Sequence, residues 1–355
     1  MNEIVTFVVP VYNSGRTIAR TIESILNQTD GRYKVMIVND GSDDDTEEIC
    51  KRYIKENKID YIYQENRGLG GARNRGMDLV DTPYVSFLDS DDWLMPEYVE
   101  KLAYHLKRHK EEKIEMIMTL PQIFHEGSKI VKDWYDKPLF ESIFPEDGVI
   151  VNPQENADIY RFEVNQCRKV LQMKFINRIH FRFRERVKWE DVYPHFYLLS
   201  KCCVCMGIGE TGFYYRIGSH TQITSLRGKE RMDILVVFED LLQYIFSENR
   251  KALYFPVMRV MVRFSIWCIR MADTDNRKNL VDKLHLVFKR LPKECITALK
   301  KGVKECCGRA DARQYLLFIT AIRRKPLSFV FYDYLWQEMG EKTIKKLLGA
   351  GERVA

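Results

Sequence analysis

The 355-residue sequence lacks the long apolar run that a membrane-spanning helix requires, which is roughly 18–20 residues free of charge. It also lacks the basic and then apolar opening of an export signal, because Met1-Asn2-Glu3 leads directly into a strand-like segment. We therefore expect a cytoplasmic protein.

Proline and glycine are too scarce for a disordered or fibrous chain, at 11 and 19 residues, while 45% of the residues are hydrophobic. The nine cysteines form no regular disulfide framework, and the seven histidines show no metal-ligand spacing. Adjacent Cys202 and Cys203 do not make the Cys-x-x-Cys pairs of a tetrahedral zinc site. These absences indicate a folded chain with reduced thiols.

Charge is divided unevenly along the chain. Residues 1–225 contain 30 Lys and Arg against 35 Asp and Glu, whereas residues 226–355 contain 26 against 15, a net charge of +11. Helical periodicity dominates this basic end from about residue 230. We expect a domain boundary near residues 226–232.

The first hundred residues alternate between short apolar runs and segments with helical spacing. Strands are predicted at residues 4–9, 35–38, 61–63 and 84–88, and a helical pattern follows each strand. This alternation predicts a parallel sheet covered by helices on both faces. Polar residues follow the strands: Asn13, Asp40, residues 66–74 and residues 89–91. We expect them to converge on one crevice at the carboxyl ends of the strands.

Asp89 and Asp91 are separated by one residue at the predicted end of the fourth strand. A kinked backbone can direct both carboxylates to one cation, and such hard oxygen ligands suit Mg²⁺ or Mn²⁺. The alternative is a solvated acidic turn that caps the next helix. The polar ends of the other strands favour the cation.

Residues 66–76 combine glycines with arginines near a predicted helix start, a composition that can bring backbone and positive charge to a phosphate. A dinucleotide fingerprint is excluded. Its third glycine would fall at Arg73, and the segment follows the third strand instead of the first.

Four segments in order, residues 8–13, 39–42, 66–74 and 87–92, resemble the motifs of family 2 inverting glycosyltransferases. The resemblance continues more weakly through Glu190-Asp191 and Tyr215-Arg216 to Ser225. It implies an α/β fold of the GT-A type, a Rossmann-like mixed sheet flanked by helices, to which this chain adds a C-terminal helical domain. Residues 1–110 would form the nucleotide-sugar-binding half, residues 111–228 the acceptor side and residues 229–355 the basic α-helical domain.

The resemblance also assigns roles to individual residues. Pro10, Tyr12 and Asp40 would hold the nucleobase, usually uracil. Asp91 would bind the divalent cation, Mn²⁺ or Mg²⁺. Asp89 would be a second metal residue and would face the ribose side of the nucleotide. The full donor-binding set implied is Pro10, Tyr12, Asn13, Asp40, Asn66, Arg73, Asp89, Ser90, Arg216 and Ser225.

Inverting transfer needs a base that deprotonates the acceptor hydroxyl. Glu190 and Asp191 occupy the position of the family's Glu-Asp pair, and the resemblance implies that Asp191 is the base and Glu190 a supporting group. Both acids can also cap the helix that follows, and the two roles are compatible.

The expected reaction moves a sugar from a nucleoside-diphosphate donor, most simply a UDP-sugar, to a glycan or lipid-linked acceptor in cell-surface polysaccharide synthesis. Two alternatives stay open. One is a sugar nucleotidyltransferase, although its glycine-rich basic loop would follow the first strand. The other is a degenerate homologue that only binds nucleotide, although Asp40, Asp89, Asp91 and Asp191 argue against it.

Three interpretations of the basic C-terminal region remain. It can be a solvated helical face over its own core, a peripheral contact with anionic lipid on the inner face of the plasma membrane, or a nucleic-acid-binding surface. Our hypothesis is that the region docks on the membrane or organises a homodimer. Arg323, Arg324 and Lys325 lie close in sequence to Phe329, Phe331, Tyr332, Tyr334 and Trp336. Nucleic-acid binding is not expected, because no recognition module is present.

Overall fold

The structure is a computed structural model that describes residues 2–54, 59–218, 226–306, 315, 318–320 and 322–323. The chain divides into two compact units, Met1–Thr221 and Gln222–Ala355. Each unit is described by itself.

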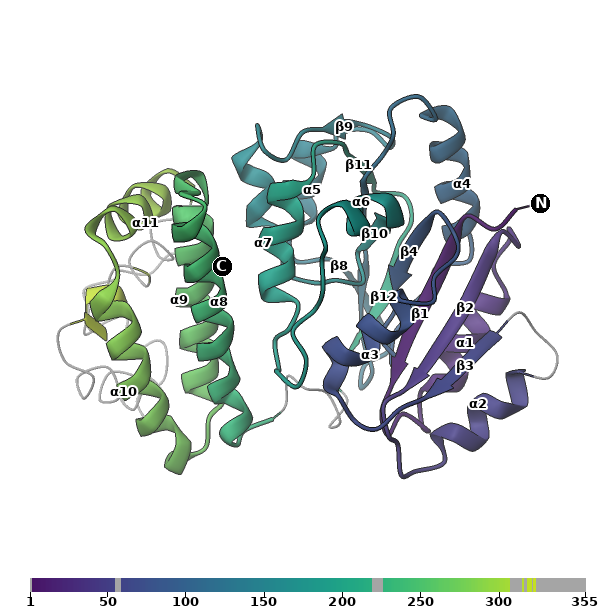
Figure 1. Ribbon diagram of the computed structural model, residues 1–355, viewed down its shortest axis with the longest axis horizontal. Coiled ribbons are helices and arrows are strands. Elements are labelled where there is room, and N and C mark those ends of the chain that lie inside the picture. Colours follow the sequence, from purple (N-terminus) through teal and green to yellow (C-terminus); the bar gives the residue numbers. More distant parts are fainter. Residues whose placement is uncertain are drawn as a thin grey trace. The chain divides into compact units, whose positions relative to one another are not determined.

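The first unit opens with the predicted alternation of strands and helices (Figure 1). The elements are β1 (Val5–Val11), α1 (Ile18–Leu26), β2 (Tyr33–Asn39), α2 (Thr46–Ile54), β3 (Ile59–Tyr63), α3 (Gly68–Met77) and β4 (Tyr84–Phe87). All four predicted strands are present. The polar segments singled out in the sequence therefore follow the carboxyl ends of β1, β2, β3 and β4.

These strands belong to an eight-stranded mixed sheet with the order β3-β2-β1-β4-β10-β6-β11-β9. The first four strands in this order are parallel, whereas β10 (Lys169–Gln172) is antiparallel to both β4 and β6 (Met116–Thr119). β11 (Cys205–Ile208) is parallel to β6, and β9 (Ile150–Val151) is antiparallel to β11. The expected mixed sheet is confirmed, and the wholly parallel arrangement extends only over its N-terminal half.

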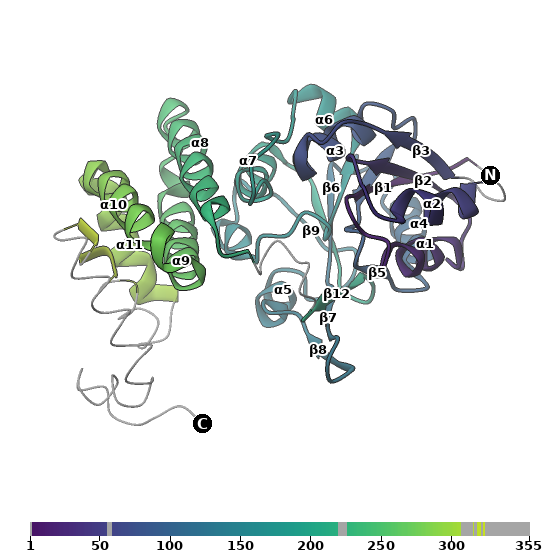
Figure 2. The same ribbon diagram turned by 90° about the horizontal axis from the view of Figure 1, so that it is seen from below.

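Helices cover both faces of the parallel half. α1, α2 and α4 (Tyr98–Arg108) lie on one face, and α3 and α6 (Met173–Arg178) lie on the other (Figures 1 and 2). Alternate residues of β1, including Val5, Phe7 and Val9, are buried in one core cluster with Ile18 and Ile22 of α1. Burial of both faces explains why β1 is an almost continuous apolar run.

Pro10 lies in a central strand, which normally excludes proline because it cannot donate to the ladder. β1 pairs with β4 only as far as Val8 opposite Phe87, and the last bond on that side runs from the Leu88 N–H to the Val8 carbonyl. The next β4-facing position is Pro10. Its missing N–H therefore falls where β4 has already left the sheet.

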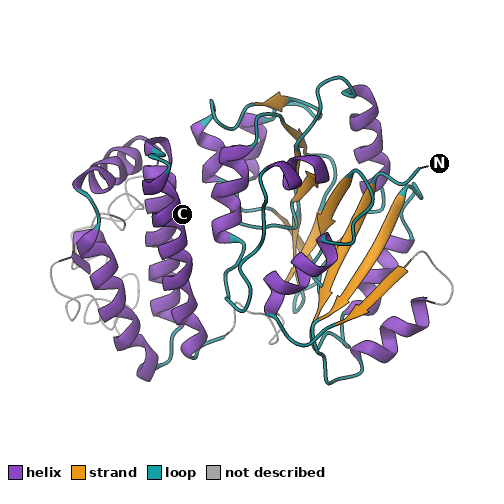
Figure 3. Ribbon diagram, viewed as in Figure 1, coloured by secondary structure: helices purple, strands orange, loops and turns teal. Residues whose placement is uncertain are grey.

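A second sheet of four strands has the order β5-β12-β7-β8 (Figure 2), and the described strands of both sheets all belong to the first unit (Figure 3). Its strands are β5 (Trp93–Leu94), β7 (Gln122–His125), β8 (Ile130–Asp133) and β12 (Phe213–Ile217). α5 (Lys137–Ile143), the 3₁₀ helix η1 (Ala157–Arg161) and α7 (Val192–Lys201) complete the described unit. β5 follows the acidic segment directly, so this sheet lies next to the residues at the carboxyl end of β4.

The described part of the second unit is helical, as expected. It contains η3 (Lys229–Met232), α8 (Asp233–Ser247), η4 (Lys251–Leu253), α9 (Tyr254–Met271), α10 (Thr274–Arg290) and α11 (Lys293–Cys306). α9 packs against α8, α10 and α11. The buried Arg231 guanidinium lies 4.2 Å from the centre of the Trp267 ring, which ties η3 to α9.

One helical stretch among the described residues, Lys251–Met271, is long and apolar enough to cross a membrane by length and composition alone. It includes α9, and 56% of its apolar window is buried inside the structure. A core helix passes the same test, so this stretch is weak evidence for a membrane span.

Candidate active site

The turn that follows β1 is bound to the turn that follows β2. Asn13 adopts a left-handed backbone with φ of 50°, which asparagine tolerates better than most residues. Its N–H donates to Ser42 Oγ at 3.0 Å, and its side-chain oxygen accepts from the Asp43 N–H at 3.0 Å. Asn13, which was predicted to bind the sugar donor, therefore links the turns that follow β1 and β2.

Asp40 is buried at the carboxyl end of β2, where one carboxylate oxygen accepts two hydrogen bonds. The donors are Gln64 Nε2 at 2.7 Å and the Arg67 N–H at 2.8 Å. Tyr12 is 53% exposed after β1, which leaves its ring accessible to a base. Asn66 lies between the two Asp40 donors in sequence and accepts from the Gly68 N–H at 3.2 Å.

The glycines of α3 contact the chain's own backbone. A Cβ on Gly70 would lie 2.2 Å from the Arg184 carbonyl oxygen, and a Cβ on Gly76 would lie 2.4 Å from a methyl group of Val8. The Asn74 side chain exchanges two hydrogen bonds of 2.9 Å with the Phe183 backbone. At Gly70 and Gly76 protein atoms fill the space that a side chain would need, so both glycines allow close packing of α3.

Arg73 projects from α3 into the centre of the site, with its side chain 3% exposed. One terminal nitrogen donates to Asp89 at 2.9 Å and the other to Glu190 at 2.7 Å. The Phe183 ring centre lies 5.4 Å from the guanidinium carbon. A buried cation thus links the acidic segment after β4 to the acids that precede α7.

Glu190 and Asp191 differ in their surroundings. Glu190 is buried, and burial raises the pKa of its carboxyl although Arg73 opposes the shift. Asp191 remains partly exposed, and burial followed by repulsion from Glu190 raises its pKa to about 7. Trp189, directly before them, has a left-handed φ of 64°, a strained conformation for a bulky residue. Asp191 is thus the acid that can exchange a proton near neutral pH.

Lys169 is a further residue beside this pair that sequence reasoning missed. It is fully buried in β10, and its ammonium donates to the Asn165 carbonyl at 2.7 Å. Burial, followed by repulsion from Arg168, lowers the pKa of Lys169 to about 7, whereas the charge of Asp191 raises it. No motif or spacing marks this lysine in the sequence, because its place beside the acids depends on the pairing of β10 with β4.

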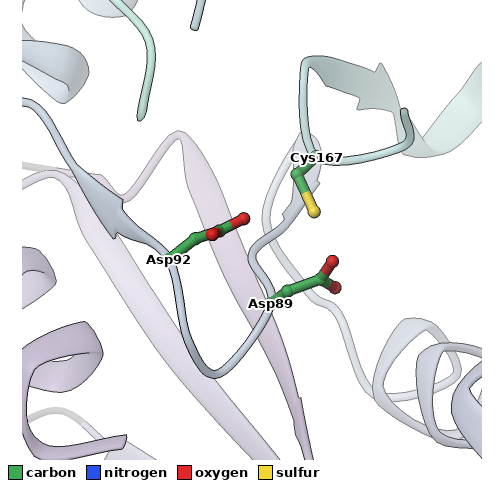
Figure 4. A group of neighbouring side chains, drawn as sticks. All are labelled: Asp89, Asp92 and Cys167. Atoms are coloured by element: carbon green, nitrogen blue, oxygen red, sulfur yellow. The ribbon is translucent and has the colours of Figure 1, made fainter. Parts of the chain in front are cut away.

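Asp89, Asp92 and Cys167 form a cluster in which one ligand atom from each residue lies within 4.8 Å of the others (Figure 4). Asp92 is fully buried, and its Oδ1 accepts from the Arg216 N–H at 2.9 Å. Its Oδ2 finds no hydrogen-bond partner among the described residues. Burial, then the charges of Asp91 and Asp89, raise the Asp92 pKa well above its ordinary value.

These acidic groups could hold a divalent cation, since the uncompensated Asp92 oxygen and two nearby carboxylates provide hard oxygen ligands. Burial raises the Cys167 thiol pKa far above its ordinary value, so its sulfur contributes no charge. Asp92 and Cys167 were not among the predicted site residues. Asp92 had a signal, because it follows Asp91 directly, whereas Cys167 had none.

The remaining predicted residues lie near this cluster or outside the described chain. Asp91 is partly exposed between Ser90 and Asp92, and Ser90 shares a hydrogen bond of 2.7 Å with Ser14 after β1. Arg216 is bonded through its backbone to Asp92. Ser225, in contrast, lies outside the described residues.

Comparison with known proteins agrees with this architecture. Residues 6–167 match the family described as glycosyl transferase family 2. The chain is 28% identical over 230 residues to glycosyltransferase GlyA of Streptococcus pneumoniae, covering 63% of this chain and 32% of the relative. It is 35% identical over 150 residues to the putative glycosyltransferase EpsH of Bacillus subtilis, covering 39% and 43%. The chain therefore spans less than half of either relative.

Solved structures show the same fold over a longer stretch. TarS residues 1–349 of S. aureus in complex with UDP superimpose with a TM-score of 0.65 at 16% identity, covering 89% of both chains. The complex of the same protein with UDP-GlcNAc gives a TM-score of 0.64. These neighbours establish the GT-A fold, and the stretch of this chain that resembles glycosyl transferase family 2 in sequence is residues 6–167.

Proposed function

We propose that this protein transfers a sugar from a UDP-sugar to a glycan or lipid-linked acceptor in cell-surface polysaccharide synthesis, with inversion at the anomeric carbon. The UDP and UDP-GlcNAc complexes of TarS support the donor class. The similarity to the minor teichoic acid biosynthesis protein GgaB, 37% identical over 124 residues, supports the acceptor class.

One observation carries the proposal. The buried Arg73 guanidinium bonds both Asp89, on the donor side, and Glu190, next to Asp191. Arg73 therefore fixes the position of Asp191 relative to the carboxyl ends of the strands, where the donor is proposed to bind. Such preorganisation is what a direct displacement needs, because the acceptor oxygen must meet the anomeric carbon in line with the departing diphosphate.

In this mechanism Asp40 accepts from the uracil N3–H, while Tyr12 and Pro10 flank the base and Asn66 lies beside the nucleotide. Asp89 and Asp91, close to Asp92, would hold Mn²⁺ or Mg²⁺. When bound, this cation neutralises charge that develops on the diphosphate. Ser90 and Asn13 fix the loops around that position.

Asp191 removes the proton from the acceptor hydroxyl as its oxygen attacks the anomeric carbon. The bond from that carbon to the diphosphate breaks, UDP leaves with the electron pair, and Asp191 retains the proton. Glu190 positions Asp191 and raises its proton affinity. No covalent enzyme intermediate is required. Arg216 and Ser225 complete the proposed donor set around the diphosphate.

The test is a panel of nucleoside-diphosphate sugars with slow donor hydrolysis as the readout, which needs no acceptor. We expect hydrolysis of one UDP-sugar. Asp191→Asn should retain UDP binding and lose turnover by at least about a hundredfold, the usual contribution of a general base. Asp158→Asn, an exposed acid on η1, is the matched control. Full activity of Asp191→Asn would remove Asp191 as the base.

Metal dependence has a separate readout. UDP with Mn²⁺ should raise the melting temperature of the wild type above the value with UDP alone. Asp91→Ala should abolish that metal-dependent increment. An equal increment in the variant would show that Asp91 is not a ligand.

We also propose that the basic helices dock on anionic lipid at the inner face of the plasma membrane. Exposed lysines on α11, Lys300, Lys301 and Lys304, support this proposal. The aromatic residues 329–336 lie outside the described residues. Vesicles with anionic lipid should retain the protein at low salt, and replacing the three lysines by glutamate should weaken retention. Equal retention on neutral vesicles would exclude this docking mode, and a homodimer would then be sought by light scattering.

A further inference from the structure

A second group of metal-ligating side chains consists of residues that the candidate active site does not use. His105 lies in the last turn of α4, Asp147 in the loop before β9, and Glu210 just after β11. One nitrogen or oxygen atom from each residue lies within 4.8 Å of the others. The three ligands come from segments far apart in the sequence, so no spacing motif could reveal them.

His105 provides the observation that points to a ligand. It is 3% exposed, and neither ring nitrogen has a hydrogen-bond partner among the described residues. Its Nε2 lies 3.7 Å from Glu210 Oε1, too far for a hydrogen bond. A buried polar group left unsatisfied costs free energy, and an ion is one of the few features that compensate for it.

The separation that is too long for a hydrogen bond suits two ligands of one ion. Zinc binds histidine nitrogen and carboxylate oxygen at about 2.0–2.2 Å, and tetrahedral geometry then places two ligand atoms about 3.4 Å apart. The His105–Glu210 distance of 3.7 Å approaches this value without movement of the backbone.

The two carboxylates are already oriented by their neighbours. Asp147 accepts from the Gly209 N–H at 2.6 Å and from the Glu210 N–H at 3.1 Å. Lys101 binds Glu210 through Oε2 at 2.9 Å, whereas Oε1 faces His105. The lysine charge opposes a cation, but its contact is with the carboxylate oxygen that the ion would not use. In that position Lys101 is an outer-sphere group that orients the Glu210 carboxylate.

Gly148 allows the imidazole to approach the Asp147 loop. Its φ of 86° is left-handed, and a Cβ there would lie 2.9 Å from both His105 Nδ1 and His109 Nε2. His105 Nδ1 is thus turned towards the backbone and His109, and its Nε2 towards the acids. One ring nitrogen remains for an ion while the other can keep its proton.

We propose that His105, Asp147 and Glu210 bind a divalent transition-metal ion, namely Zn²⁺, which fastens the end of α4 to the Asp147 loop and to the segment after β11. A nitrogen ligand beside two carboxylates favours zinc over Mg²⁺ or Ca²⁺. Water completes the coordination. The site is structural, and it is independent of the proposed transferase reaction.

The experiment is calorimetric titration of the full chain with Zn²⁺ in excess Mg²⁺, which occupies oxygen-only sites. Wild-type protein should bind one Zn²⁺ per chain in this assay. Glu210→Gln should weaken that binding at least about tenfold. Glu146→Gln, an exposed acid beside the site, is the matched control and should bind as the wild type does.

Thermal unfolding provides the second readout and a check on folding. Glu210 is exposed, so Glu210→Gln should melt close to the wild type in a chelator and lose the increase that Zn²⁺ gives the wild type. His105→Gln should lose it too. Equal Zn²⁺ affinity in the wild type and Glu210→Gln, or no binding by the wild type, would overturn the proposal. Binding that Glu210→Gln retains but Cys203→Ser abolishes would overturn it as well, by assigning the ion to an exposed thiol.

Discussion

Single side chains set the chemistry of this site through their charge balance. Arg73 and Glu190 are both buried and lie 2.7 Å apart, and Arg73 also serves Asp89. Loss of the guanidinium would leave a carboxylate buried without its partner, which is far more costly than loss of an exposed ion pair.

Arg73→Ala should therefore lower the free energy of unfolding by about 3–5 kcal/mol in urea denaturation. Arg67→Ala is the control, because its pair with Glu185 is largely exposed. It should cost about 0–1 kcal/mol. A similar small loss in both variants would contradict the central role given to Arg73.

The pH dependence of activity tests Asp191. Its pKa of about 7 means that the base form is lost on acidification, so kcat/KM should fall about tenfold per pH unit below pH 7 and level off above it. Glu190→Gln removes a neighbouring negative charge and should shift this limb to lower pH. If the acidic limb of the kcat/KM profile stays at the same pH in Glu190→Gln, coupling between Glu190 and Asp191 is excluded.

The sequence predicted the positions of residues best where they depend on local sequence, at the ends of strands. Asp40, Asp89 and Asp91 were located because they follow apolar runs that end abruptly. Lys169 and Cys167 were missed because their position depends on β10 pairing with β4, a contact between segments about 85 residues apart, with Val170 opposite Ser86. Nothing in the local sequence records such a contact.

Among the elements, α3 shows how glycine content serves packing. Seven of its ten residues are buried, and Gly76 lies against Val8 of β1 and Val38 of β2. The helix can therefore approach the sheet closely enough to place Arg73 above the strand ends.

Gly76→Ala should destabilise the fold. The added methyl group would meet Val8 at 2.4 Å, and overpacking of this kind typically costs about 1–3 kcal/mol. Alanine's helix preference of about 0.5–1 kcal/mol offsets only part of that cost. Gly31→Ala, with nothing within 4 Å, should be nearly neutral in the same thermal melts. Equal melting temperatures for both variants would contradict this close packing.

Element prediction was reliable where strands and helices alternate in the first hundred residues, but it did not identify the second sheet. In that sheet β12 pairs with both β5 and β7, and no regular alternation with helices marks these strands in the sequence. This sheet supplies the Arg216 N–H to Asp92. The contact between Arg216 and Asp92 was not predicted because the sheet that provides it was not predicted.

At the scale of the whole molecule, the family match and the first compact unit end at different residues. The match ends at residue 167, whereas β10 begins at Lys169 and occupies the middle of the eight-stranded sheet. A fragment of residues 1–167 would expose the unpaired edges of β4 and β6.

That fragment should lack a cooperative thermal transition by circular dichroism, whereas residues 1–221, the complete first unit, should show one. A cooperative transition in the shorter fragment, at the same temperature as in the longer one, would show that β10 is dispensable.

The position of β10 also has a consequence for synthesis on the ribosome. Translation delivers β1 to β4 and Asp89 first, but the strand that covers β4 and the second acid that pairs with Arg73 are made later, at residues 169–172 and 190. During this interval the nascent chain carries an open strand edge, and Arg73 has Asp89 but not yet Glu190 as a partner in a half-built core. A nascent chain in this condition is a natural client for chaperones, and slow translation before residue 190 would prolong its exposure to aggregation.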